Sequence, residues 1–299
     1  MSQIKIKQTC WSDDKDILQE IRNQVFIQEQ RVPAELEWDD LDNTAKHWLG
    51  FIDDTPVACA RLLSNGKIGR MAVLKPFRKM GLGSLLLESI IAQQDKPFEL
   101  HLSAQCHAFS FYLSNGFSAC SAPYDDASIP HIDMQFSDTL NHKYQLGNDS
   151  SLYHGSTLLE AKGYLDLILT QTTRSIIVMC NDLCHAILAS QSMSDCIKKQ
   201  CKLNKHFRVY LLVKNFSQLE RSHNLLNLLV RLPTYFHIRQ SKENLPNQIL
   251  FDSTAWLDYE NNTYRVNFSD RSKIKLTMER FNTCWHSAKL INDIRPLSI

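Results

Sequence analysis

The sequence predicts an α/β protein of two domains, each a sheet flanked by helices. Along the whole chain, short apolar runs of strand length alternate with segments in which apolar residues recur every three or four positions. The 299 residues also exceed the length of an average single domain. A polar, turn-rich stretch at residues 139–151 separates the halves and is the predicted linker. We therefore expect one domain over residues 1–138 and another over residues 152–299.

The composition is that of an ordinary globular protein and excludes a fibrous or disordered one. Hydrophobic residues make up 43% of the chain and charged residues 22%. The net charge of +1 conceals an acidic first half, which suits a cationic acceptor such as an amine, and a basic second half. The chain begins without the pattern of a signal peptide and has no apolar run of membrane-spanning length. A cytoplasmic location without a membrane partner is therefore expected.

The nine cysteines form no Cys-x-x-Cys pair, and several of them lie in apolar runs. Buried free thiols in a reducing compartment are the simplest interpretation. Cys180, Cys184 and His185 could supply half of a metal site. No second ligand pair follows at a recognisable spacing, so no metal is predicted.

The first domain is expected to begin with a strand, because isoleucines alternate with lysines among its first seven residues. Capping side chains at residues 12–14 then precede a helix, expected over residues 15–28. Residues 29–46 are polar and acidic and contain a proline, which argues against a strand and indicates a loop. A solvated surface is the alternative to a functional role for its acidic run at residues 35–42. Two strands follow over residues 47–63 and form a hairpin that turns at a pair of aspartates.

The stretch from residue 68 to residue 93 carries the clearest local signal. An apolar run at residues 68–74 predicts a strand, and apolar residues at helical spacing predict a helix over residues 82–93. Between them Gly81 and Gly83 form a tight turn, so the first N–H groups of the helix and its dipole could bind a phosphate or pyrophosphate. A turn that only caps the helix is the alternative. The spacing matches neither the dinucleotide fingerprint nor the Walker loop.

Strands and helices continue to alternate after this stretch. In the rest of the first domain we expect strands over residues 98–104, 117–122 and 132–136, and a helix over residues 107–114. In the second domain we expect helices over residues 158–169, 193–203, 219–232 and 274–286, strands over residues 174–180, 207–213 and 236–239, and a hairpin over residues 248–259. This order predicts a parallel sheet between helices in the second domain.

Four segments of the first domain resemble a known enzyme superfamily. The motif Arg78-x-x-Gly81-x-Gly83 after a strand resembles the acyl-CoA-binding signature of the GNAT N-acetyltransferases. Tyr112, with a Gly-Phe pair four residues further on, resembles the next helix of that superfamily. Residues 22–47 and 129–134 resemble its ElaA-like branch. The four segments occur in the same order as in the superfamily, which makes the resemblance specific.

This resemblance implies an N-acetyltransferase that moves an acetyl group from acetyl-CoA, its co-substrate, to a primary amine, either a small amine or a lysine-like group. It implies a mixed sheet in which the central strand and the next strand separate to form the cleft. Tyr112 matches the general acid that protonates the departing thiolate. The implied CoA-binding residues are Met71, Ala72, Val73, Arg78, Lys79, Gly81, Leu82, Gly83, Ser84 and Gln105.

The sequence leaves open which base deprotonates the amine. Glu29 follows the first helix, where the superfamily forms its acceptor site, and His131 belongs to a residue type that titrates near neutrality. Glu37, Asp39 and His47 are further candidates, and a chain of water molecules is an equal alternative. No Cys–His arrangement suggests an acyl-enzyme, so direct attack by the amine is expected.

The second domain resembles one half of a phospholipase D-like domain. The catalytic His-x-Lys-x-x-x-x-Asp motif of that family is missing at the corresponding stretch, residues 247–252, so we expect a non-catalytic binding or assembly module. The alternative function is an acyl-CoA-binding sensor or scaffold whose second domain binds a protein, an anionic ligand or nucleic acid. Four lysines over residues 198–205 are the support for nucleic acid, which is not expected. Homo-oligomer formation is left open.

Overall fold

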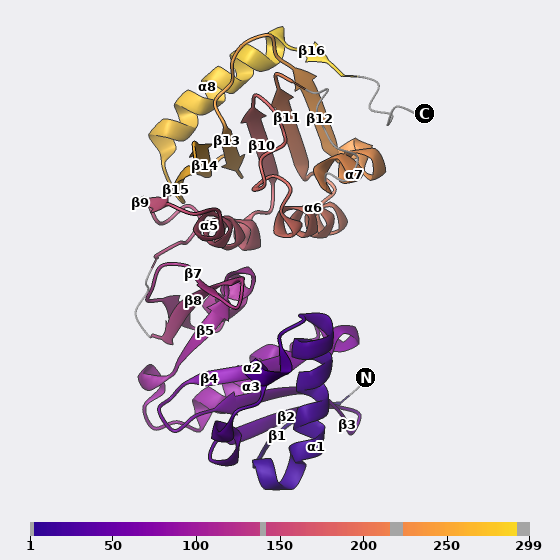
Figure 1. Cartoon of the computed structure of the whole chain (residues 1–299), viewed down its shortest axis with the longest axis vertical. Coiled ribbons are helices and arrows are strands. Elements are labelled where there is room, and N and C mark those ends of the chain that lie inside the picture. The colour runs from indigo at the N-terminus through magenta and orange to yellow at the C-terminus, as the bar shows by residue number, and fades with distance from the viewer. Residues whose placement is uncertain (1–2, 138–141, 216–223, 292–299) are drawn as a thin grey trace. The chain divides into compact units, whose positions relative to one another are not determined.

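The computed structural model describes residues 3–137, 142–215 and 224–291, and in it the chain divides into two compact units (Figure 1). The first unit consists of Met1–Ala104, Phe111–Ala122 and Ile132–Asn141, and the second of Gln105–Ser110, Pro123–His131 and His142–Ile299. The second unit therefore takes in two short stretches from the first half of the sequence. The domain boundary at residue 138 stays a prediction, because residues 138–141 lie outside the described part.

The main sheet of the first unit is antiparallel, with the strands in the order β1-β2-β3-β4. These strands are β1 (Ile4–Thr9), β2 (Lys46–Ile52), β3 (Thr55–Leu62) and β4 (Ile68–Val73). The expected hairpin between β2 and β3 is confirmed. Asp53 and Asp54 form its turn with φ angles of 45° and 64°, the left-handed conformation that two-residue hairpin loops favour.

Helices cover both faces of this sheet. Helix α1 (Trp11–Arg22) places Leu18 and Ile21 against Leu49, Cys59 and Ala72 of the sheet. Helix α3 (Leu82–Ala92) lies on the opposite face, where a side-chain methyl of Leu82 would be 3.2 Å from a Cβ built on Gly50. The expected helix over residues 15–28 differs in detail: α1 starts at Trp11, is interrupted at Asp14, and gives way to a π-helix, η1 (Asn23–Glu29). Short helices α2 (Ala34–Glu37) and η2 (Asp40–Asn43) occupy the expected acidic loop.

Strands β4 and β5 (His101–Gln105) separate after a single point of contact. The two strands meet at one parallel bridge, between Lys67 and His101. Beyond it, β5 joins a different sheet, in the order β5-β8-β6, with β7 paired to β8. The members of that sheet are β6 (Phe117–Ala119), β7 (Tyr124–Asp126) and β8 (Ile129–Phe136). Within the described residues, one edge of β4 thus carries no neighbouring strand, which is the separation that the superfamily resemblance implies.

The short segments that connect these elements complete the first half of the chain. They are η3 (Lys75–Phe77), η4 (Pro97–Glu99), η5 (Cys106–Ala108) and α4 (Phe109–Ser114).

The second unit is built on a mixed sheet with the strand order β16-β12-β11-β10-β13-β14-β15-β9. Its strands are β9 (Leu152–Gly155), β10 (Ser175–Cys180), β11 (Arg208–Val213), β12 (Phe236–Gln240), β13 (Gln248–Phe251), β14 (Ala255–Glu260), β15 (Thr263–Asn267) and β16 (Lys289–Leu290). The expectation of a parallel sheet is wrong for more than half of it. Within the described part of this sheet, only β10, β11 and β12 pair in parallel, because β13, β14 and β15 are joined by tight turns that return the chain antiparallel.

Helices flank this second sheet as the periodicity predicts. They are α5 (Leu158–Gln171), α6 (Gln191–Leu203), α7 (Asn224–Arg231), α8 (Arg271–Ser287) and the short η6 (Pro233–Tyr235). The expected start of the third helix, over residues 219–223, lies outside the described part. Helix α8 packs Ile274, Phe281 and Cys284 into a core with Leu212 and Trp256. No helix within the described residues is both long and apolar enough to cross a membrane.

Helix α5 contacts the two stretches that the second unit takes from the first half of the chain. Ser110 donates a hydrogen bond of 2.7 Å to the hydroxyl of Thr170. A Cβ on Gly163 would lie 2.7 Å from the Cβ of Pro123, so only glycine fits at this approach. Asp166 on the same helix is buried, and one of its carboxylate oxygens has no hydrogen-bond partner among the described residues. Burial raises its pKa to about 6.

Candidate active site

The glycine turn leaves the start of α3 open to a ligand. Gly81 precedes the helix with a φ of 86°, and Lys79 also has a positive φ, of 67°. Glycine brings no side chain to cap the helix, and the first intrahelical bond runs from the Leu85 N–H to the Gly81 oxygen at 3.0 Å. The N–H groups of residues 82–84 belong to the first turn, which has no intrahelical acceptors. They and the helix dipole can bind an anion.

The two glycines of the turn are required for different reasons. Gly81 is required by its left-handed backbone conformation, which costs a residue with a side chain about 1 kcal/mol. A Cβ on Gly83 would instead lie 3.0 Å from the ring of Phe111. Packing alone therefore accounts for Gly83, while its small size also lets a ligand approach the backbone.

The unpaired edge of β4 offers main-chain groups beside this turn. The Leu74 N–H donates to the Val57 oxygen on β3 at 2.9 Å, so alternation directs the peptide groups of Val73 to the other edge. The Val73 oxygen there accepts a bond of 2.9 Å from Nε of Arg78. Ala72 is buried and faces Cys59, so its side chain belongs to the core.

Tyr112 lies at β4 although 41 residues separate it from Met71. Its hydroxyl contacts the Met71 sulfur at 3.8 Å, and its ring packs edge-on against Phe111 and Phe117. Burial raises the pKa of the Tyr112 phenol to about 12. The hydroxyl is therefore protonated at neutral pH and can donate a proton to a strong base that forms beside it.

Glu29 is held by Arg78 in a two-pronged ion pair, with distances of 2.8 and 2.5 Å. The hydrogen bonds from Arg78 lower the pKa of the Glu29 carboxyl. Glu29 is therefore ionised at neutral pH, and the lowered pKa makes it a weaker base. The pair connects the end of η1 to the loop before α3.

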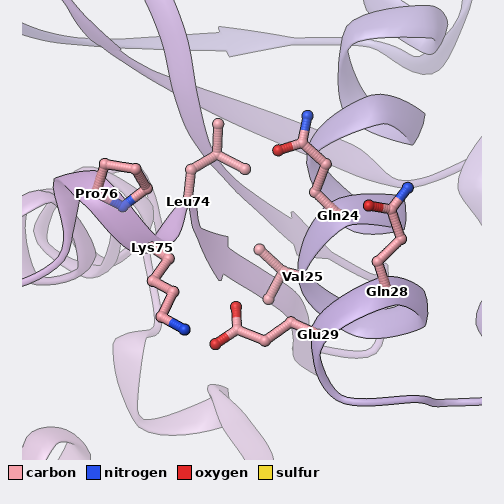
Figure 2. Close-up of a pocket in the computed structure, with 7 residues that line it drawn as sticks. All are labelled: Gln24, Val25, Gln28, Glu29, Leu74, Lys75 and Pro76. Carbon is pink, nitrogen blue, oxygen red and sulfur yellow. The ribbon is translucent and has the colours of Figure 1, made fainter.

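A pocket of about 350 Å³ opens next to this ion pair (Figure 2). One wall is the π-helix η1, a rare geometry that often marks functional sites. The other wall is Leu74, which directly follows β4, and the start of η3. Figure 2 shows the carboxylate of Glu29 and the ammonium of Lys75 directed into the same opening. The lining residues are Gln24, Val25, Gln28, Glu29, Leu74, Lys75 and Pro76.

The remaining base candidates have other contacts. His131 donates from Nδ1 to the Ile129 oxygen at 2.9 Å and stacks on Tyr124. It lies in the second unit, as does Gln105, the last residue of β5. His47 is buried and donates from Nε2 to the Asp42 oxygen at 2.9 Å. Burial lowers its pKa.

The alternative interpretation of the acidic run at residues 35–42, a solvated surface, does not hold for two of its carboxylates. Glu37 and Asp42 are only 3% and 2% exposed, because both form ion pairs with arginines. Sequence reasoning missed these arginines as a group. The available signal was a charged residue inside an apolar strand, as at Arg61, since such a residue requires a buried partner.

The two cysteines considered for a metal site differ in exposure: Cys180 is buried and Cys184 is exposed. In the described part of the chain, no group of three or more His, Cys, Asp or Glu side chains is arranged to hold a metal ion.

Comparison with known protein families matches both halves of the chain. Residues 13–137 match the family described as acetyltransferase (GNAT) domain. Residues 157–297 match a domain of unknown function, DUF7931.

Similar proteins cover the first half. The "Uncharacterized N-acetyltransferase YjcF" of Bacillus subtilis is 34% identical over 120 residues, which are 38% of this chain and 86% of that protein. "Protein ElaA" of Escherichia coli is 34% identical over 129 residues, 39% of this chain and 83% of that protein. The crystal structure of E. coli ElaA aligns at a TM-score of 0.41 with 30% identity, covering 45% of this chain and all of that one.

A similarity of another kind involves the phospholipase D family member Nuc from Salmonella typhimurium. It aligns at a TM-score of 0.37 with 10% identity, over 48% of this chain and 100% of that chain.

Proposed function

Because the chain belongs through residues 13–137 to the GNAT acetyltransferase family, and is thus an N-acetyltransferase that uses an acyl-CoA, we propose that it moves an acetyl group from acetyl-CoA to a primary amine. The observation that carries this proposal is the position of Tyr112. A protonated phenol lies against Met71 on the unpaired edge of β4, and this strand leads directly into the glycine turn. An acid therefore lies against the edge that would dock the thioester, and this edge leads into the anion site.

In this proposal the donor occupies the edge of β4 and the start of α3. The pantetheine arm pairs with the main chain at Met71 and Val73, as an added strand would, and the pyrophosphate binds the N–H groups of residues 79–84. Arg78 occupies the Val73 oxygen in the free protein, so its guanidinium must leave when the pantetheine arrives. The positive charge of Arg78 then suits a move toward the pyrophosphate.

The transfer itself proceeds by direct attack. The amine nitrogen attacks the thioester carbonyl carbon and forms the C–N bond, after which the tetrahedral intermediate expels the CoA sulfur. Tyr112 donates its proton to that sulfur. It regains a proton from the attacking nitrogen, which is positively charged in the intermediate and must lose one proton to become the amide. The amine is deprotonated by a chain of water molecules, by Glu29 or by His131. The ion pair with Arg78 makes Glu29 the weaker base.

The acceptor remains a small amine or a lysine-like group, and the structure changes the reason for this proposal. The acidic residues that suggested a cation site are partly neutralised by arginines. The opening beside Glu29 is polar and carries both signs of charge, which suits an acceptor with further polar groups besides its amine.

We propose for the second domain a binding role, as expected from its lack of a catalytic motif. A pocket of about 500 Å³ in the second unit favours this role. Polar and apolar atoms share its wall about equally, and the lining residues are Asn181, Leu245, Pro246, Asn247, Asp258, Tyr259, Glu260, Asn261, Thr263 and Arg265. A wall of mixed character that includes charged and amide side chains fits a small ligand with both apolar and polar groups.

The test of the proposed activity is release of free thiol from acetyl-CoA with a panel of primary amines and lysine peptides. Amine-dependent thiol release by the full chain is the expected result. CoA binding without thiol release for any amine would favour the alternative, a sensor or scaffold, and absence of both would refute the proposal.

A further inference from the structure

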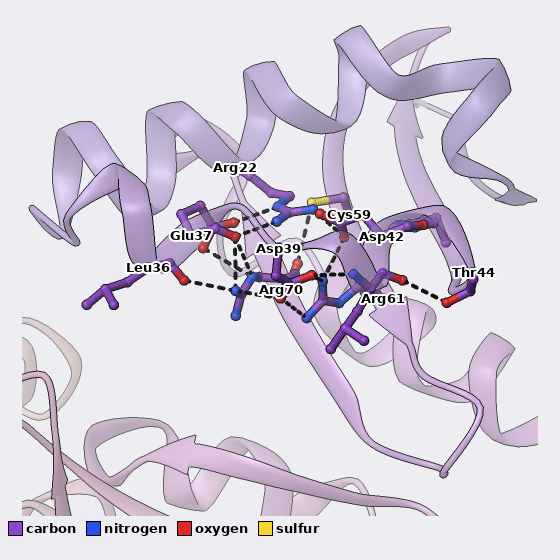
Figure 3. Close-up of polar contacts among 11 residues, drawn as sticks. Arg22, Leu36, Glu37, Asp39, Asp42, Thr44, Cys59, Arg61 and Arg70 are labelled. Atoms are coloured by element: carbon purple, nitrogen blue, oxygen red, sulfur yellow. Dashed lines mark hydrogen bonds and ion pairs between the residues drawn. The ribbon is translucent and has the colours of Figure 1, made fainter.

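A closed network of ion pairs in the first unit joins α1, β3 and β4 to residues 37–42 (Figure 3). Three arginines, each from a different element, meet three carboxylates from one short segment. The arginines are Arg22 of α1, Arg61 of β3 and Arg70 of β4, and the carboxylates are Glu37, Asp39 and Asp42. The charges of the six groups balance when all are ionised.

Two of the arginines form the buried base of this network. Arg22 binds Glu37 at 2.6 Å and Asp42 at 2.8 Å, and its guanidinium lies over the rings of Trp11 and Trp38. Arg61 binds the same Asp42 oxygen at 2.8 Å. Burying such charges gains little stability over apolar packing, so the network is better understood as fixing geometry.

Arg70 differs from the other two in its backbone. It has a φ of 50°, inside a strand. Gly69 pairs with Arg61 and Ala72 pairs with Cys59, so that Arg70 and Met71 together lie opposite the single residue Ala60. This is a β-bulge, a feature that bends the strand and increases its twist. The left-handed conformation is unfavourable for arginine and must be held by its surroundings.

The contacts of the Arg70 side chain stabilise this backbone conformation. Arg70 donates to the main-chain oxygens of Leu36 at 3.1 Å and Glu37 at 2.9 Å, and it contacts a carboxylate oxygen of Asp39 at 3.3 Å. Its side chain is 25% exposed, so the contact lies at the rim of the network. Asp39 is in turn fixed by two bonds from Arg61, of 2.6 and 3.0 Å. The segment that carries the carboxylates therefore anchors the bulge.

The position of the bulge connects the network to the proposed chemistry. Met71, the second bulge residue, contacts the Tyr112 hydroxyl at 3.8 Å. The bulge also follows closely after the bridge at Lys67, the last point at which β4 touches β5. A shift of the bulge would thus change both the edge of β4 and the distance from this edge to Tyr112.

We propose that Arg70 is a positioning residue for acetyl transfer: its bonds to the segment 36–39 hold the β4 bulge, and through it Met71, at the separation from Tyr112 that the reaction needs. This inference rests on the proposed function. It assigns a role in the transfer step rather than in CoA binding, because the anion site lies beyond the bulge, at the start of α3. Misplacing reacting groups by about 1 Å can cost about a hundredfold in rate.

The variant that tests this is Arg70→Lys, which keeps the charge but loses the planar fork that reaches several acceptors. Arg31→Lys is the matched control, because Arg31 also has a positive φ, of 60°, and its side chain is exposed. We expect Arg70→Lys to lower kcat at least about tenfold and to change KM for acetyl-CoA less than about threefold. Arg31→Lys should change neither.

Two readouts separate positioning from general loss of structure. In the Tyr112→Phe background, Arg70→Lys should cost less than about threefold further in kcat, because both changes act on the same proton transfer. The ¹³C-methyl NMR resonance of Met71 should also move in Arg70→Lys and stay in place in Arg31→Lys. If Arg70→Lys does not fold, Asp39→Asn takes its place in both readouts, because this change weakens one of the contacts that hold the Arg70 side chain.

Several results would overturn the inference: an unchanged kcat in Arg70→Lys, an effect confined to KM, or a fall of kcat by the same factor in the Tyr112→Phe background as in wild type. Wild-type protein that neither binds CoA nor releases thiol would refute the proposed function, and the catalytic part of this inference with it. The NMR comparison needs no turnover, so an unmoved Met71 resonance would overturn the geometric part on its own.

Discussion

Tyr112→Phe removes one oxygen atom from the centre of the proposed site. The hydroxyl contacts the Met71 sulfur at 3.8 Å, and a thioether is a weak acceptor. The ring keeps its packing against Phe111 and Phe117. The free energy of unfolding should therefore change by less than about 1 kcal/mol.

The catalytic effect of this substitution should be much larger. General acid catalysis contributes about a hundredfold to ten-thousandfold in rate, so kcat should fall by at least about two orders of magnitude. Since the pKa of Tyr112 is raised to about 12, the phenol stays protonated at pH 10. Wild-type kcat should therefore show no decline from ionisation of this tyrosine between pH 7 and pH 10.

The assay is thiol release at saturating acetyl-CoA and amine, together with calorimetric affinity for CoA and a thermal unfolding curve. Tyr235→Phe is the matched control, because the Tyr235 hydroxyl donates a bond of 2.8 Å to the Cys201 oxygen in the second unit. The control should lose some stability and no activity. Unchanged turnover in Tyr112→Phe would refute the assignment of the acid.

Two further predictions concern carboxylates. Glu29→Gln should lower kcat less than about tenfold, because the ion pair with Arg78 already makes Glu29 a weak base. CoA affinity should stay equal or rise, because the change frees Arg78. A hundredfold loss of kcat would instead identify Glu29 as the base. Asp166→Asn should stabilise the protein at pH 8 by up to about 3 kcal/mol and by little at pH 4. The pKa of Asp166 is raised from 3.8 to about 6. Below pH 3.8 the carboxyl is neutral and its burial as a charge costs no stability, whereas the free energy of unfolding falls as the pH rises through 6 and the buried group ionises. Denaturant unfolding at both pH values measures this, and an equal effect at the two would contradict it.

Much of the local structure around the candidate site could be predicted from the sequence, because its signals are local. A strand, a left-handed glycine and an amphipathic helix need only a few neighbouring residues each, and β4, Gly81 and α3 lie where the pattern places them. The hairpin at Asp53 is local in the same sense. The separation of β4 from β5 was implied only by the superfamily resemblance, because no residue pattern indicates that two neighbouring strands part.

The ion-pair network could not be predicted, because its partners are distant in sequence. Arg70 and Glu37 are 33 residues apart, and an acidic stretch by itself is usually solvated. The π-helix η1 also escaped prediction, because seven residues are too few for its period to differ visibly from that of an α-helix. Strand β9 lies at the edge of the predicted linker, where its four residues gave no clear alternation.

Calorimetric titration of the full chain with acetyl-CoA tests the central claim most directly. It should be repeated with Ser84→Glu, which places a carboxylate in the first turn of α3. Negative charge is favourable there for the helix, so this variant should fold as well as wild type, yet it should repel the pyrophosphate. Ser89→Glu adds the same charge further along α3 and is the control.

We expect micromolar binding for wild type and Ser89→Glu, and at least about tenfold weaker binding for Ser84→Glu. Equal binding by all three proteins would place the CoA site elsewhere. No binding by wild type would mean that the glycine turn only caps its helix and would contradict the account.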